Sequence, residues 1–186
     1  MDVNDELGTL ERDGQLCVLR YRRVLRQPPE TVWQALTDDA HLAGWFPTTI
    51  EGEWSAGAPL RFSFRENEAP PMDGEMLAVN APSLLELRWG DDVLRFELAP
   101  EGAGSVLTLT VTFPEYAKAA RDGAGWHVCL EQLGYVADGE ELPFTPSDRW
   151  RVVHPDYVDR LGPEASALGP PEEWERVHGA GDAGSQ

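Results

Sequence analysis

The sequence predicts an α+β protein in which a curved antiparallel sheet of about six to seven strands packs against one long helix. Apolar and polar residues alternate in a series of short stretches, which is typical of strands with one buried face. Short turn signals separate these stretches, whereas parallel neighbours would need longer crossovers. One later stretch has helical spacing and is the only large element available to cover the sheet.

The first strand is predicted over residues 15–26, QLCVLRYRRVLR. Leu19 and Tyr21 alternate with arginines, so one face of this strand is apolar and the other is in water. Arg23 falls on the apolar face and interrupts it. Residues 1–14 show no comparable alternation, and we expect them to form a frayed lead-in.

Two short helices are predicted after this strand. The first covers residues 29–36, because proline suits the first turn of a helix. Thr37-Asp38-Asp39 is a typical capping sequence for the second helix, which ends near Gly44-Trp45-Phe46-Pro47.

The remaining strands follow one another closely. Ala81-Pro82 and Gly90-Asp91 are among the turn signals between them, so a meander is expected. The strands are predicted at residues 48–54, 60–64, 74–80, 84–89, 93–98 and 105–113.

The long helix is predicted from GAGWHVCLEQLGYV, residues 123–136. Trp126, Cys129, Leu130 and Leu133 recur at spacings of three and four residues, so they share one face of a helix. We expect this face to lie on the concave side of the sheet.

The chain divides into a domain of residues 1–139 and an acidic, proline-rich extension of residues 140–186. The extension contains too many apolar residues to be a simple linker, and we expect it to dock on the domain as far as about residue 162. A helical turn is predicted at 155–161. The end after about residue 176 is expected to be loose.

The composition excludes several classes of function. The formal net charge is −18, which disfavours nucleic acid and anionic membranes as partners. No apolar stretch is long enough to insert into a membrane, and the acidic N-terminus lacks the apolar core of a secretory signal. We therefore expect a cytoplasmic protein in which Cys17 and Cys129 are buried thiols.

Three stretches resemble a known family. They are PPETVWQALTDDAHLAGWFP at residues 28–47, EWSAGAPLRFSF at 53–64, and the helix at 123–136. In order and sequence they are similar to the helix-grip fold of the START-like (SRPBCC) superfamily, and within it to the family named for the C-terminal domain of the Hsp90 ATPase activator (AHSA1-like). The chain departs from the family at Ala56-Gly57-Ala58-Pro59, where a Gly-Gly pair is common.

This resemblance implies a hydrophobic cavity between the sheet and the long helix. Superfamily members bind lipids, sterols or polyketides, and a minority are enzymes such as cyclases. We expect a binding module for an unidentified hydrophobic small molecule or lipid, with no cofactor. The residues expected at the cavity are Trp33, Trp45, Phe46, Phe62, Phe64, Met76, Trp89, Phe96, Trp126, Cys129, Leu130 and Leu133.

Polar candidates for the same cavity are few. Tyr21 and Arg23 lie on the inner face of the first strand, where Arg23 contacts a ligand, pairs with a structural acid such as Glu75 or Glu97, or lies beyond the core at the strand end. His127 lies four residues before Glu131, so the two form either an acid–base pair or an ordinary surface pair.

No catalytic or metal site is assigned from the sequence. The four histidines are scattered, and no zinc spacing, nucleophile elbow or phosphate-binding loop is present. The acidic runs, among them Asp38-Asp39, Asp91-Asp92 and Glu172-Glu173, are expected to be solvated.

Two alternative functions remain at this point. A cyclase or hydrolase would use polar cavity residues. A protein-interaction module would form a homodimer or bind a chaperone through the extension, with Phe144, Trp150 and Trp174 as anchors.

Overall fold

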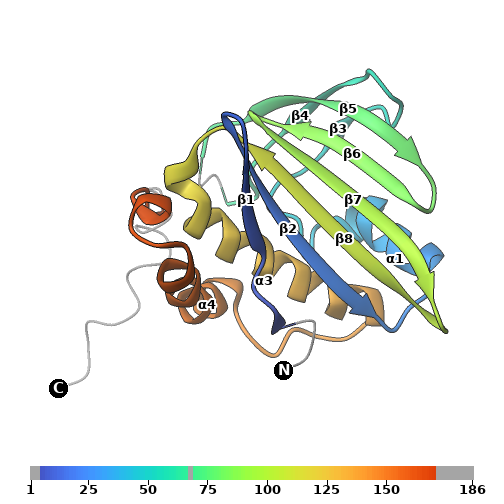
Figure 1. Ribbon diagram of the computed structural model, residues 1–186. Helices are drawn as coiled ribbons and strands as arrows, with labels where there is room; N and C mark the ends of the chain where they lie inside the picture. The colour runs from blue at the N-terminus through green and yellow to red at the C-terminus, as the bar shows by residue number, and fades with distance from the viewer. Residues whose placement is uncertain (1–4, 67–68, 171–186) are drawn as a thin grey trace.

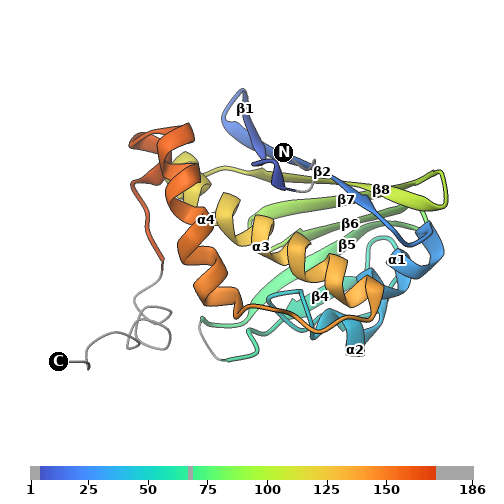
Figure 2. The ribbon, with the colours of Figure 1, turned by 90° about the horizontal axis from the view of Figure 1, so that it is seen from below.

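The computed structural model describes residues 5–66 and 69–170, and eight strands in these residues form one open antiparallel sheet in the order β1-β2-β8-β7-β6-β5-β4-β3. The curved sheet wraps around one long helix, α3, and a second helix, α4, packs beside α3 (Figures 1 and 2). This confirms the predicted fold class. The elements are β1 (Thr9–Asp13), β2 (Leu16–Leu25), α1 (Pro29–Thr37), α2 (Asp39–Leu42), β3 (Glu51–Gly52), β4 (Pro59–Phe62), β5 (Met72–Asn80), β6 (Leu84–Trp89), β7 (Asp92–Glu101), β8 (Gly104–Phe113), η2 (Tyr116–Lys118), α3 (Ala119–Asp138), α4 (Pro146–Leu161) and η3 (Glu164–Ser166).

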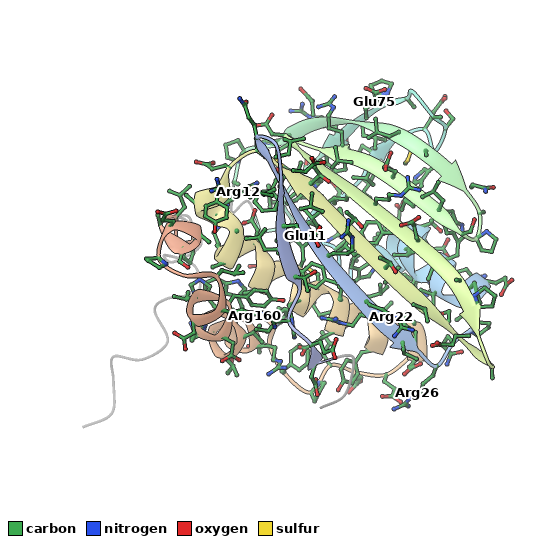
Figure 3. All side chains as sticks on the ribbon, viewed as in Figure 1. Glu11, Arg12, Arg22, Arg26, Glu75 and Arg160 are labelled. Atoms are coloured by element: carbon green, nitrogen blue, oxygen red, sulfur yellow. The ribbon has the colours of Figure 1, made fainter. Side chains whose placement is uncertain are left out.

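The register of β2 on β8 separates the two faces of the sheet. Leu19 lies opposite Val111 and Tyr21 lies opposite Leu109, and all four side chains are buried against the helical side. The alternate positions face outward, where Arg22 pairs with a glutamate of β7 across 3.2 Å on the outer surface (Figure 3). The period of two seen in the sequence therefore fixes which residues enter the core.

The N-terminal segment is more ordered than expected, because β1 pairs with β2 along the edge of the sheet. Gly14, with φ of 63°, supplies the left-handed conformation that the tight turn needs. Only Leu10 of β1 is half-buried, so the strand depends on backbone pairing and leaves little apolar pattern in the sequence. The prediction of a frayed lead-in over residues 9–13 was wrong for this reason. Conversely, the strand predicted at 48–54 is reduced to Glu51–Gly52 and an isolated bridge from Thr48 to Phe64.

Helix α4 replaces the single helical turn predicted at 155–161. Thr145 caps its first turn, because the Thr145 hydroxyl accepts a hydrogen bond from the backbone N–H of Asp148. Pro155 lies inside the helix but on its exposed side, where solvent can satisfy the carbonyl that loses its helical partner. The tail after residue 170, including the end expected to be loose, lies outside the described residues.

Tyr157 attaches α4 to the rest of the protein. Its side chain is fully buried, and its hydroxyl accepts a hydrogen bond of 2.7 Å from the backbone N–H of Gly8. Its ring lies against α3 at Gly123, where a Cβ atom would come within 2.8 Å of the ring. A glycine at this position therefore lets the two helices approach.

We predict that Gly123→Ala lowers the free energy of unfolding by about 1–3 kcal/mol, because the added methyl group overpacks the Tyr157 contact. Gly134→Ala is the matched control in the same helix, since a Cβ there meets only Leu25 at an ordinary 3.9 Å. Urea unfolding followed by circular dichroism measures both. Equal stability of the two variants would contradict the close approach.

Candidate ligand pocket

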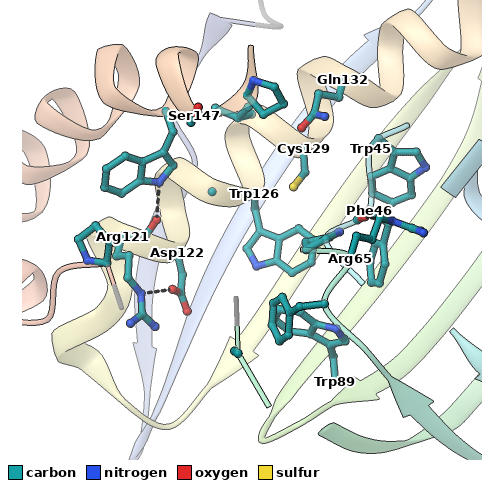
Figure 4. A pocket seen from close by; sticks show the side chains of 18 of the residues that line it. Trp45, Phe46, Arg65, Trp89, Arg121, Asp122, Trp126, Cys129, Gln132 and Ser147 are labelled. Carbon is teal, nitrogen blue, oxygen red and sulfur yellow. Dashed lines mark hydrogen bonds and ion pairs between the residues drawn. The ribbon is translucent and has the colours of Figure 1, made fainter. Parts of the chain in front are cut away.

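A pocket of about 730 Å³ opens between α3, the start of α4 and the segments that follow α2 and β4 (Figure 4). Its volume lies in the range of known small-molecule sites. Five of the six aromatic side chains of its wall are Trp45, Phe46, Phe64, Trp89 and Trp126. The wall is completed by Ala43, Pro47, Arg65, Glu66, Ala69, Met72, Asp91, Asp92, Lys118, Arg121, Asp122, Gly125, Val128, Cys129, Gln132, Thr145, Pro146, Ser147, Trp150 and Pro170.

The aromatic side chains of the wall hold one another in place. Trp89 packs edge-on against Trp126 with ring centroids 5.4 Å apart, and Phe46 lies 5.9 Å from Trp126. The indole N–H of Trp45 donates to the carbonyl of Ala35, and that of Trp89 donates to the Thr48 hydroxyl. Because these donors are already satisfied, the rings offer the pocket an apolar and well-fixed surface.

One face of α3 runs along the pocket, and Lys118, the residue directly before the helix, continues this face. Lys118, Asp122, Gly125, Cys129 and Gln132 all belong to the wall and recur at spacings of three and four residues. In Figure 4, Asp122, Cys129 and Gln132 follow one another along this helix. The pocket face is therefore charged at Lys118 and Asp122, has no side chain at Gly125, and is weakly polar at Cys129 and Gln132.

The apolar residues expected at a cavity fall into two groups. Trp45, Phe46, Phe64, Trp89, Trp126 and Cys129 belong to the pocket wall. The others are part of the packed core, where Trp33 is half-buried and the rest are buried. Strand alternation distinguishes the inner face from the outer face, but only tertiary neighbours decide whether an inner side chain meets other atoms or a void. The core members are Trp33, Phe62, Met76, Phe96, Leu130 and Leu133.

A charged cluster forms the polar end of the pocket, and the sequence did not reveal it. The Lys118 ammonium lies 2.7 and 2.8 Å from the two carboxylate oxygens of Asp92 and 3.2 Å from Asp122. Arg121 donates to Asp122 across 2.7 Å. Asp92 is only 3% exposed, so the expectation that Asp91-Asp92 is solvated was wrong for this residue, while Asp91 is exposed.

These ion pairs oppose the effect of burial on the pKa of both partners. Burial raises the pKa of Asp92, and Lys118 opposes that shift. Burial also tends to lower the pKa of Lys118, but Asp122 and Asp92 outweigh it and hold that pKa above its ordinary value. The signal available in the sequence was the single lysine of the chain, placed four residues before an aspartate on a helix.

Cys129 is a half-buried free thiol on the pocket wall, and Cys17 is a buried free thiol elsewhere. Burial raises the pKa of the Cys129 thiol to about 12. The thiol is therefore neutral near physiological pH and is a poor nucleophile. Its contribution to the pocket is a small, polarisable apolar surface.

The polar candidates Tyr21 and Arg23 lie away from this wall. The Tyr21 hydroxyl donates to the carbonyl of Gly123, and the Arg23 guanidinium donates to the carbonyls of Arg22 and Glu6. Arg23 is 3% exposed and also lies 3.5 Å from Nδ1 of His127. Within the described residues its side-chain hydrogen bonds thus go to main-chain carbonyls and a histidine, and not to Glu75 or Glu97.

His127 and Glu131 meet as the spacing predicted, but beneath α4. His127 is 2% exposed, so the expectation of a surface pair was wrong. Its Nε2 lies 3.4 Å from Glu131, and its Nδ1 lies 3.1 Å from the Tyr157 hydroxyl. This network assigns the ring proton to Nε2, so that Nδ1 accepts from Tyr157. Arg149 of α4 then binds both carboxylate oxygens of Glu131, at 2.6 and 2.8 Å.

The arrangement stabilises the charged form of Glu131. Burial alone would raise the pKa of this carboxyl group, but hydrogen bonds from Arg149 and His127 outweigh burial and lower the pKa to about 2. Burial raises the pKa of Tyr157 to about 12, so its hydroxyl remains a donor. Among the residues that the structure describes, no group of histidines, cysteines and acids is arranged to hold a metal ion.

We predict that Glu131→Gln destabilises the protein at neutral pH by up to about 3 kcal/mol, the value of a pKa lowered from 4.5 to about 2. Since the pKa is depressed by folding, this contribution is present above the unfolded value of 4.5 and is lost as the pH falls toward 2. The stability difference from wild type should therefore shrink from about pH 5 to about pH 3 in urea titrations. Glu11→Gln, which removes an exposed ion pair, serves as the control and should change stability little. A Glu131→Gln difference that is the same at all pH values would refute the assignment.

Solved structures with the same fold support this architecture. A conserved protein of unknown function from Enterococcus faecalis, EF2215, superposes with a TM-score of 0.69 at 21% identity, covering 83% of this chain and 90% of that one. The BPP1335 protein of Bordetella parapertussis gives 0.65 at 27% identity, covering 87% and 94%. CalU16 of Micromonospora echinospora gives 0.60 at 19% identity, covering 83% and 95%. No curated protein matches the chain.

The match to a family model is more specific than the structural likeness. The model described as activator of Hsp90 ATPase homolog 1-like protein matches residues 26–137, from the end of β2 to the last turn of α3. This segment contains both short helices and most of the sheet. No helix among the described residues has the length and apolar character of a membrane span. The fold and family support a ligand-binding or activator-like domain, and the chain belongs to the activator of Hsp90 ATPase homolog 1-like family.

Proposed function

We propose that this protein binds an uncharged apolar small molecule or lipid in the pocket between the sheet, α3 and α4. The observation that carries the proposal is the aromatic wall formed by Phe46, Trp89 and Trp126. The indole donor of Trp89 is satisfied by Thr48, so the wall gains most from contact with an apolar surface.

The charges of the pocket support an uncharged ligand. Lys118 and Arg121 are paired with Asp92 and Asp122 inside the wall, so these groups need no counter-charge from a ligand. Arg65 donates to main-chain carbonyls next to the aromatic residues. The net charge of −18 also disfavours the approach of an anion.

Binding without turnover is favoured over catalysis. An acid–base role would use His127 and Glu131, but these residues are engaged beneath α4 by Tyr157 and Arg149 and do not belong to the pocket wall. The one thiol on the wall is neutral because its pKa is raised. Free thiols suit a reducing compartment, so a cytoplasmic location is part of this proposal.

A partner-binding role of the extension is less well supported. Phe144 packs edge-on against Tyr135 of α3, and Trp150 belongs to the pocket wall and donates to a carbonyl of α3. These two anchors are therefore used within the chain, while Trp174 lies outside the described residues.

The experiment is native mass spectrometry of the freshly purified protein, followed by titration with Nile red, an uncharged apolar dye. We expect wild type to carry an extractable apolar adduct or to bind the dye, and Trp89→Ala to weaken dye binding about tenfold, a difference of about 1.4 kcal/mol. Trp54→Ala is the matched control, because Trp54 is also half-buried but does not belong to the wall.

Thermal unfolding by circular dichroism establishes that both tryptophan variants are folded. Equal dye affinity in wild type and folded Trp89→Ala would contradict the pocket as the binding site. Absence of both an adduct and dye binding in wild type would contradict the proposed function itself.

A further inference from the structure

Gly125 lies on the pocket face of α3 and meets nothing else in the described protein. A Cβ atom built on this residue has no heavy atom within 4 Å. Gly125 nevertheless belongs to the pocket wall, so the open space in front of it is the pocket itself. Glycine inside a helix is less stable than alanine, because it loses more backbone freedom on folding. The helix therefore carries a destabilising residue at a site where a larger one would fit.

The other helical glycines do not share this combination. Gly123 makes room for the Tyr157 ring, which a Cβ atom would approach to 2.8 Å. Gly134 lies on the helix away from the pocket wall, with Leu25 at an ordinary contact distance of 3.9 Å. The close approach of Tyr157 thus explains why a glycine occupies position 123. Gly134 serves as the reference for a glycine in the same helix that neither makes a close contact nor lies on the pocket wall. Gly125 alone among these three exposes bare helix backbone to the pocket.

The residues around Gly125 differ in polarity along the pocket face of α3. One turn earlier, Asp122 is held by Lys118 and Arg121, and one turn later Cys129 contributes a neutral thiol. Trp126, next to Gly125 in the chain, packs against the aromatic wall (Figure 4). An apolar group placed against Gly125 would therefore have an aromatic neighbour at Trp126 and a polar boundary at Asp122.

We propose that the ligand is an uncharged apolar molecule that lies against the backbone of α3 at Gly125, and that the size of residue 125 determines which ligands fit. This inference rests on the proposed function and adds the place of contact and the residue that limits ligand size. A side chain at position 125 would project into the pocket and occupy the volume that the ligand needs, and its Cβ atom would have no heavy atom of the folded protein within 4 Å.

The test compares Gly125→Leu, Gly125→Ala and Gly134→Ala with wild type in Nile red binding and thermal unfolding. Both alanine variants should raise the melting temperature, because alanine favours the helix and neither clashes. Gly125→Leu should weaken dye binding about tenfold or more, and Gly125→Ala should weaken it by a smaller factor. Gly134→Ala should bind the dye as wild type does.

The outcomes separate this inference from the proposed function. If wild type binds the dye and folded Gly125→Leu binds it equally well, the contact at Gly125 is refuted while the pocket remains. If Gly125→Leu does not fold, the comparison of Gly125→Ala with Gly134→Ala decides, and equal affinity refutes the inference. If wild type binds no dye, both the proposed function and this inference fail.

Discussion

One helix has to cover the concave face of a sheet that is much wider than itself. Eight strands spaced about 4.8 Å apart extend over roughly 34 Å, whereas a helix with its side chains is only about 10 Å across. Curvature of the sheet around α3 reduces this difference, α1 packs against β7 and β8, and α4 packs beside α3 (Figure 2). The pocket is the space that these helices leave uncovered, so it is a consequence of the layer geometry and not of one residue.

The rotation of α3 about its axis decides what the pocket contains. Gly123, His127 and Glu131 recur every four residues and face α4, where Tyr157 and Arg149 hold them. At the start of the helix, Lys118 and Asp122 are fixed by Asp92 and Arg121. Such partly buried ion pairs contribute little net stability, because desolvation offsets much of the attraction. We infer that their main effect is to fix which face of α3 lies toward the pocket.

The extension takes part in this site although it lies beyond the family match. The match ends at residue 137, yet the segment at the start of α4 belongs to the pocket wall, through its cap Thr145 and through Pro146, Ser147 and Trp150. A cap at Thr145 and the Glu131–Arg149 pair place that segment against α3. The shape of the pocket therefore depends on two parts of the chain, of which one lies inside the matched region and the other outside it.

The sequence by itself determined the class of fold, because alternation of period two and helical spacing depend only on local order along the chain. Tyr21 and Leu109, for example, were placed on the inner face by alternation alone, and the structure buries both. Tertiary structure decided which inner aromatics face a void, since Phe62 and Phe64 have the same periodicity but only Phe64 reaches the pocket wall. It also decided the pairing of Asp92 with Lys118 and the burial of His127 beneath α4, because both depend on segments 26 and 30 residues apart in the chain. Local pattern gives the direction of a side chain, whereas only the packing of distant segments determines what that side chain meets.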